Sequence, residues 1–168
     1  MRKLFISFDD TIIDDKKYNT EKFKSTIKKF LKNRIRKYST QLNIKFIYNY
    51  SDEVENTCGC FKIKEDDCLA YIYIIMNNCE ESDNVVEKII TVLLHEIGHF
   101  ISFNNKYLKS DGSTNQYDFF YDNFLRERVE KQNKFKNYDE LYSYWKNNPE
   151  EIFANNFAYK NIDIFYNC

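Results

Sequence analysis

Hydrophobic positions along the chain form two kinds of pattern: short strand-like stretches, and longer segments with helical spacing. Four short stretches are rich in β-branched and aromatic residues, namely residues 3–8, 43–50, 58–64 and 69–76. This composition over such lengths predicts β-strands. The last stretch, LAYIYIIM, carries apolar or aromatic side chains on both of its faces.

Two other segments place apolar residues three and four apart, which predicts amphipathic helices. The first runs from about residue 20 to residue 42, and the second from Asn84 to Phe103. Asn84 is a favourable N-cap, and Glu87 follows it three residues later as in a capping box. Apolar side chains surround most of the second helix, which is therefore expected to be buried.

The C-terminal half carries only helical patterns. They fall near residues 117–135 and 139–145, and a last helix starts at Asn148 with Pro149 in its first position. The order is an early helix with a small mixed sheet, a buried helix, and then helices alone. This order predicts a compact α+β fold, and the length predicts one domain over residues 1–168.

Composition and charge narrow the classes of function. The chain has 25 basic and 26 acidic residues, so we expect neither nucleic acid nor a membrane as partner. The sequence shows no signal-peptide core and no long apolar run. The five cysteines are odd in number, which without a signal peptide indicates reduced thiols inside a cell. Four of them could in principle hold a second metal, but their spacing matches no common zinc knuckle: Cys58, Cys60, Cys68 and Cys79. We therefore expect a cytoplasmic protein, with a monomer favoured.

Both histidines of the chain lie on the predicted buried helix. His95 and His99 are four residues apart, so both imidazoles can face one ion, and zinc suits imidazole nitrogen. Glu96 is rotated by about 100° from His95, where it can act as general base. The alternative is that the histidines are only two polar residues on an apolar helix. Burying His95, Glu96 and His99 together costs free energy, however, and a favourable interaction must compensate for it. Gly98 costs about 1 kcal/mol relative to Ala, which predicts close approach of another element.

A catalytic zinc site needs a third protein ligand, and no further histidine exists. Glu151 is the best candidate because it shares a helix face with Ala154 and Ala158, whose small side chains let two helices pack closely. Glu151 also lies three residues after the N-cap Asn148, where a glutamate often only bonds back to the cap. Three competing glutamates remain: Glu127, Glu130 and Glu150.

The pairing of HEIGHF with the distant stretch EIFANNF, which opens at Glu151, resembles a known family. It is similar to the catalytic domain of anthrax lethal factor and the secreted Pro-Pro endopeptidases, which are zincins of the gluzincin type. The resemblance covers roughly residues 69–159. It implies a zincin-like fold with one Zn²⁺ held by His95, His99 and Glu151.

The resemblance also implies a catalytic tyrosine seven residues before the ligand glutamate. That position is Tyr144, with Tyr142 as a rival, and its role would be to hydrogen-bond the developing oxyanion. The family's second glutamate is Asn155 here, which puts that residue's role in doubt. Its amide oxygen can still accept a hydrogen bond from a ligating histidine. In zincins the strand before the active helix is a sheet edge that pairs with substrate; residues 69–76 are either this edge or a buried central strand.

A second resemblance concerns the stretch ANNFA at residues 154–158. HEIGH followed by such a stretch is similar to intracellular metallopeptidases that cleave phage-type repressors. The sequence therefore predicts a zinc-dependent endopeptidase that hydrolyses a peptide or protein substrate. Two alternatives remain: a non-catalytic zinc-containing binding or regulatory protein on a zincin scaffold, and a repressor-cleaving regulatory metallopeptidase.

Overall fold

A computed structural model of the chain describes residues 4–8, 19–38, 40–48, 57–64, 69–80, 82–107 and 138–168. These ranges hold helices and strands together, which confirms the predicted α+β class. The elements are β1 (Leu4–Phe8), α2 (Thr20–Leu31), β2 (Gln41–Ile47), β3 (Gly59–Lys64), β4 (Leu69–Ile75), α3 (Met76–Glu80), α4 (Val85–Tyr107), α6 (Tyr138–Lys146) and α7 (Pro149–Tyr166).

The four strands form one mixed sheet in the order β1-β2-β4-β3. β1 pairs with β2 and β2 with β4 in parallel, whereas β3 pairs with β4 antiparallel. Because β4 lies between β2 and β3, the interpretation of residues 69–76 as an edge strand is wrong. Their apolar character on both faces fits the central position, and β3 is the edge strand on that side of the described sheet.

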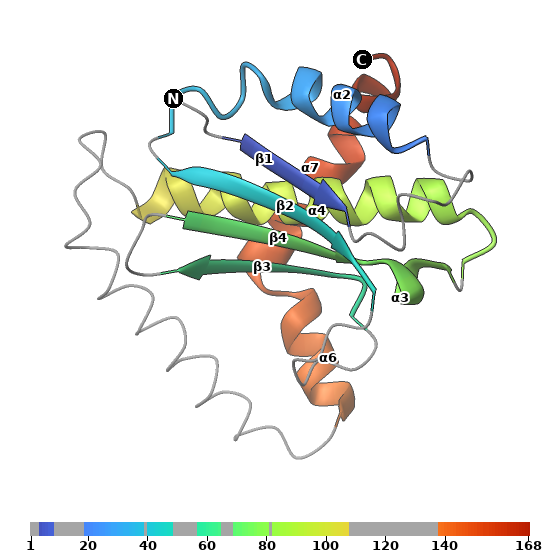
Figure 1. The fold of residues 1–168 in the computed structure, drawn as a ribbon. Helices are drawn as coiled ribbons and strands as arrows, with labels where there is room; N and C mark the ends of the chain where they lie inside the picture. Colours follow the sequence, from blue (N-terminus) through green and yellow to red (C-terminus); the bar gives the residue numbers. More distant parts are fainter. Residues whose placement is uncertain are drawn as a thin grey trace.

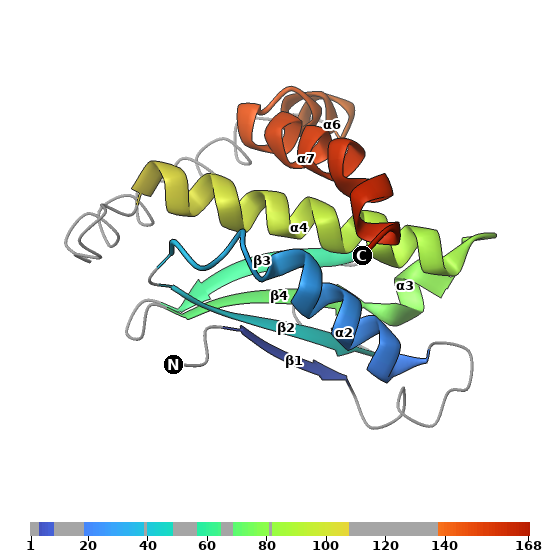
Figure 2. The same ribbon diagram turned by 90° about the horizontal axis from the view of Figure 1, so that it is seen from above.

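The helices cover one face of the sheet (Figure 1). Seen from above, α4 and α2 lie over the strands, and α6 and α7 lie on the far side of α4 (Figure 2). α4 is therefore packed between the sheet and α7. The C-terminal end of α7 reaches α2, where the Phe165 ring packs on Phe30 with centroids 5.4 Å apart.

The hydrophobic core fills the space between the sheet and α4. Because side chains alternate between the two faces of a strand, every second residue of β2 and β4 enters this core. α4 meets them with a wide apolar face, as the sequence predicts. The fully buried residues of these three elements include Leu42, Ile44, Phe46, Ala70, Ile72, Ile74, Leu93, Leu94, Ile97 and Phe100.

Two predicted helix boundaries need correction. α2 ends at Leu31 rather than near residue 42, and Gln41 already belongs to β2. Ile35 and Tyr38 are nevertheless buried, so their helix-like spacing reflects core packing along an irregular connection. α4 continues to Tyr107, beyond the predicted end at Phe103. The predicted helix at residues 117–135 lies outside the described residues.

The last helix begins as predicted. The side chain of Asn148 accepts a hydrogen bond from the backbone N–H of Glu150 at 2.9 Å, and Pro149 occupies the first helical position. This cap fixes the first turn of α7, which carries Glu151. Within the described ranges, none of the helices is both long and apolar enough to cross a membrane.

Candidate metal centre

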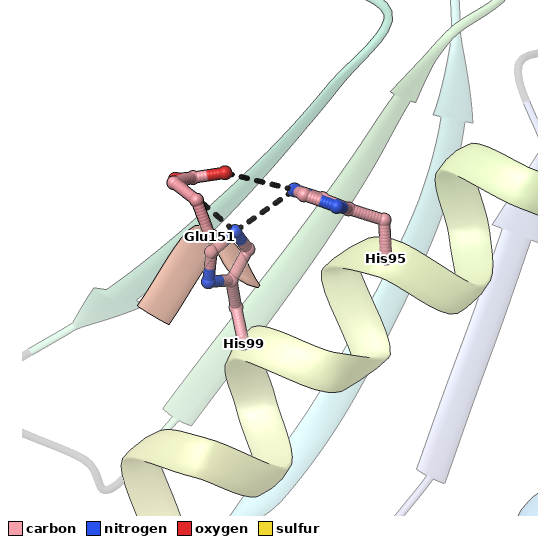
Figure 3. A group of neighbouring side chains, drawn as sticks. All are labelled: His95, His99 and Glu151. Carbon is pink, nitrogen blue, oxygen red and sulfur yellow. Dashed lines mark hydrogen bonds and ion pairs between the residues drawn. The ribbon is translucent and has the colours of Figure 1, made fainter. Parts of the chain in front are cut away.

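His95 and His99 project from the same face of α4 towards α7 (Figure 3). One helical turn separates them, so their rings lie side by side, and their Nε2 atoms are 3.0 Å apart. Both side chains are partly buried, with 22% and 16% of their surface exposed. The two nitrogens thus point at one common position that solvent can still reach.

Glu151 approaches the same position from the first turn of α7 (Figure 3). Its Oε2 lies 3.3 Å from Nε2 of His95, and its Oε1 lies 3.5 Å from Nε2 of His99. The side chain therefore faces the histidines rather than folding back to the cap residue Asn148. The competitors Glu127 and Glu130 lie outside the described residues, and Glu150 contributes its backbone N–H to the cap.

The spacing of these three groups fits a small divalent cation. Tetrahedral coordination at the usual zinc–nitrogen and zinc–oxygen bond lengths separates neighbouring donor atoms by about 3.3 Å. The Nε2 atoms of His95 and His99 are 3.0 Å apart, and they lie 3.3 Å from Oε2 and 3.5 Å from Oε1 of the Glu151 carboxylate, respectively. Two imidazole nitrogens with one carboxylate oxygen are also a donor set that suits Zn²⁺. The three residues could therefore hold a metal ion, as their chemistry also indicates.

The cysteines do not form a second metal-binding group in the described part of the chain, where His95, His99 and Glu151 are the one such cluster. Cys79 is fully buried, and burial together with the neighbouring Cys58 thiol raises its pKa to about 12. A thiol in this state is a poor metal ligand because the ligand is the thiolate.

Gly98 allows α4 and α7 to come close together. A Cβ atom at this position would lie 2.8 Å from Cα of Ala154 and 3.2 Å from Cβ of Phe157. Ala154 and Ala158 are buried in the same interface. The close approach predicted from Gly98 is thus present.

Asn155 orients one of the two imidazoles. Its Oδ1 lies 2.9 Å from Nδ1 of His95. An amide oxygen can only accept a hydrogen bond, so Nδ1 of His95 is the donor to Asn155, and Nε2 is the ring nitrogen that faces Glu151. The contact expected from the Asn155 amide oxygen to a histidine is thus present.

His95 and Glu151 shift each other's pKa values. Burial raises the pKa of Glu151, but hydrogen bonds to both histidines outweigh this effect and bring it to about 2. Burial lowers the pKa of His95, but the hydrogen bond to Glu151 and the charges of Glu96 and Glu151 outweigh it, so the net pKa is raised. Glu151 is therefore ionised at neutral pH and attracts positive charge, whether a proton on His95 or a cation.

Glu96 lies on the inner side of the same helix turn. Its side chain is only 6% exposed, and burial raises its pKa although both histidines lower it. Gly59 of β3 is packed directly against it. Gly59 is not among the site residues predicted from the sequence, although an isolated glycine within a strand pattern is a signal of close backbone approach.

β3 also contacts the cluster through an aromatic side chain. The Phe61 ring lies nearly parallel to the His99 ring, with centroids 6.5 Å apart and an angle of 16°. Phe103, one turn after His99, lies 6.0 Å from the same Phe61 ring. The edge strand therefore borders the face of α4 that carries His99.

Tyr144 lies on α6 and is partly buried. The contacts that join the ligands to one another come from α4 and α7, so a role for Tyr144 remains a prediction. The side chain of its rival Tyr142 lies outside the described residues. Comparison of the chain with protein-family models, curated proteins and solved structures finds no match.

Proposed function

We propose that this chain is a zinc-dependent endopeptidase with a zincin-like architecture. The observation that carries the proposal is the convergence of the His95, His99 and Glu151 side chains on one position, with Glu96 on the same turn of α4. Three protein ligands leave one coordination position for water or substrate, which is the arrangement of catalytic rather than structural zinc sites. A structural site has no need of Glu96.

The proposed chemistry divides between the metal and the side chains. Bound Zn²⁺ would act as a Lewis acid and lower the pKa of a coordinated water towards about 7. Glu96 accepts a proton from the water whose oxygen attacks the scissile carbonyl carbon. Glu96 then gives that proton to the leaving nitrogen as the carbon–nitrogen bond breaks. The raised pKa of Glu96 suits both halves of this transfer.

Tyr144 has the role that the family resemblance implies. Its hydroxyl would donate a hydrogen bond to the oxyanion that develops on the scissile carbonyl. Tyr144 lies on α6, the helix immediately before α7, and six residues separate it from Glu151 in the chain. α6 and α7 lie together on the ligand side of α4 (Figure 2), which supports the assignment.

The edge strand β3 supports a peptide as the substrate. The backbone carbonyl of Cys58, directly before β3, accepts a hydrogen bond from the backbone N–H of Ile75 of β4 at 2.9 Å. Because alternate residues of an antiparallel strand direct their N–H and C=O groups to the same side, Gly59, Phe61 and Ile63 direct theirs away from β4. An extended peptide that paired with these groups would lie along the metal-ligating face of α4.

The test is peptide cleavage that depends on the metal and on its third ligand. A diverse peptide library is incubated with the protein after chelation and after return of Zn²⁺, and products are read by mass spectrometry. We expect cleavage only with Zn²⁺, loss of cleavage in Glu151→Gln, and retention in the matched control Glu150→Gln. Full zinc affinity and activity in Glu151→Gln would contradict the proposed ligand set.

A further inference from the structure

Gly59 on β3 lies against the side chain of Glu96. A Cβ atom added at Gly59 would be 2.9 Å from Oε1 and 3.0 Å from Cγ of Glu96, and 2.5 Å from Cγ1 of Val92. Ordinary van der Waals contact begins at 3.4 Å. The backbone of β3 therefore occupies a place beside the carboxylate that only a residue without a side chain can take.

β3 cannot move away from α4 without breaking several interactions. Six of its residues are in register with β4, from Gly59 opposite Ile74 to Lys64 opposite Leu69. The chain just before β3 is also fastened to α3, where the Asn78 side-chain amide donates to the Thr57 carbonyl at 2.7 Å. Added bulk at position 59 must then be accommodated by the side chains on α4.

Of the two side chains that face position 59, Glu96 is the one more able to move. Val92 is β-branched, and such side chains have essentially one rotamer in a helix. Glu96 has a longer unbranched side chain, so its carboxylate can rotate away. A substitution at position 59 would thus displace the carboxylate while the helix stays in place.

We propose that Gly59 is a positioning residue for Glu96, because its lack of a side chain lets the edge strand hold the carboxylate in its reactive place. This inference rests on the proposed function, in which Glu96 is the general base. A Cβ added at Gly59 would meet Val92 and Glu96, whereas His95, His99 and Glu151 contact one another and His95 also contacts Asn155. Positioning of the base and metal binding are therefore separable.

The expected effect of Gly59→Ala is a selective loss of turnover. A displacement of about 1 Å at a catalytic group can lower the rate by about a hundredfold. We expect kcat to fall by about that factor, with KM and zinc affinity within about twofold of the wild type. Cys60→Ala, on the neighbouring residue of the same strand, is the control and should leave kcat unchanged.

A second variant separates the two contacts. Val92→Ala removes the atom nearest to the added Cβ, so Gly59→Ala/Val92→Ala should regain folding stability but keep the low kcat. Return of kcat to the Val92→Ala level in the double variant would overturn the proposal, because packing against Val92 alone would then explain the loss. Wild-type kcat in Gly59→Ala would overturn it directly.

A measurement without substrate tests the contact itself. In the metal-free protein, nuclear Overhauser cross-peaks are expected between Hα of Gly59 and Hγ of Glu96, and Gly59→Ala should shift the ¹³C resonance of the Glu96 carboxyl. Missing cross-peaks or an unchanged resonance would overturn the positioning role. If the wild type shows these signals but cleaves nothing, the proposed peptidase function fails while the packing of Gly59 on Glu96 stands.

Discussion

The substitution Gly98→Ala tests how the two ligand-bearing helices are brought together. The added Cβ would lie 2.8 Å from Cα of Ala154, which is about 0.6 Å short of the closest ordinary contact of 3.4 Å. Because this partner is a backbone atom, no side-chain rotation relieves the overlap, and α7 must shift as a unit. Glu151 lies three residues before Ala154 on α7 and would shift with it.

The change in the free energy of unfolding caused by Gly98→Ala is the sum of two opposing contributions. Overpacking a tight interface costs about 1–3 kcal/mol, whereas Ala in place of Gly stabilises a helix by about 1 kcal/mol. The free energy of unfolding of the metal-free protein should thus fall by roughly 0–2 kcal/mol. Metal–ligand distances tolerate only about 0.2 Å of error, so zinc affinity should fall by about 10–100-fold, or about 1.4–2.8 kcal/mol.

Zinc affinity would be measured by competition with a chelating indicator, and stability by urea unfolding of the metal-free protein. Thr91→Ala is the matched control because it changes helix propensity at an exposed position on the same helix. Ala154→Gly should not rescue Gly98→Ala, since the overlap is with backbone atoms. A zinc affinity within threefold of the wild type, together with a gain in stability, would refute the reasoning.

Three further predictions concern the same centre. Asn155→Ala removes the acceptor for Nδ1–H of His95 and should lower zinc affinity by about 10-fold or more, measured by the same competition; an unchanged affinity would show that His95 needs no such partner. Because the pKa of His95 is raised, its proton competes with the metal. Zinc affinity should therefore fall as the pH drops through that raised pKa, with a slope approaching one proton in a titration of log affinity against pH; a flat profile between pH 6 and 8 would contradict this. Asn148→Ala removes the cap of α7 and should lower the free energy of unfolding by about 1 kcal/mol in urea, and no change would mean that this cap is not used in solution.

His95 and Glu151 should make the stability of the metal-free protein depend on pH in opposite directions. The raised pKa of His95 contributes stability below its unfolded pKa, and this contribution is lost as the pH rises through the raised folded value. Glu151, with its pKa lowered to about 2, contributes stability above its unfolded value of 4.5, and this is lost as the pH falls towards 2.

The strongest sequence signals were those with a local physical cause. The Asn148–Pro149 start of α7 is an N-cap followed by a residue that fits the first helical turn, and both effects act within a few residues. The spacing of His95 and His99 fixes their common face as soon as the helix is assigned. Gly98 marked a close approach because glycine in a helix interior needs an external reason.

Features that depend on distant parts of the chain were less predictable. The apolar spacing of Ile35 and Tyr38 continues the helical pattern of α2, but these residues pack on the core from an irregular connection. Strand order is likewise not encoded locally, so β4 could not be assigned to the centre or the edge from its own residues. Gly59 gained meaning only when β3 was placed beside α4.

The measurement that tests the central claim most directly compares the zinc-loaded wild type with Glu96→Gln on one diverse peptide library. Zinc content is measured for both samples, because the account predicts one ion per chain in each. It also predicts cleavage at a preferred sequence by the wild type and none by Glu96→Gln. Equal zinc with no cleavage by either protein, including on intact protein substrates, would contradict the account and favour a zinc-containing binding protein.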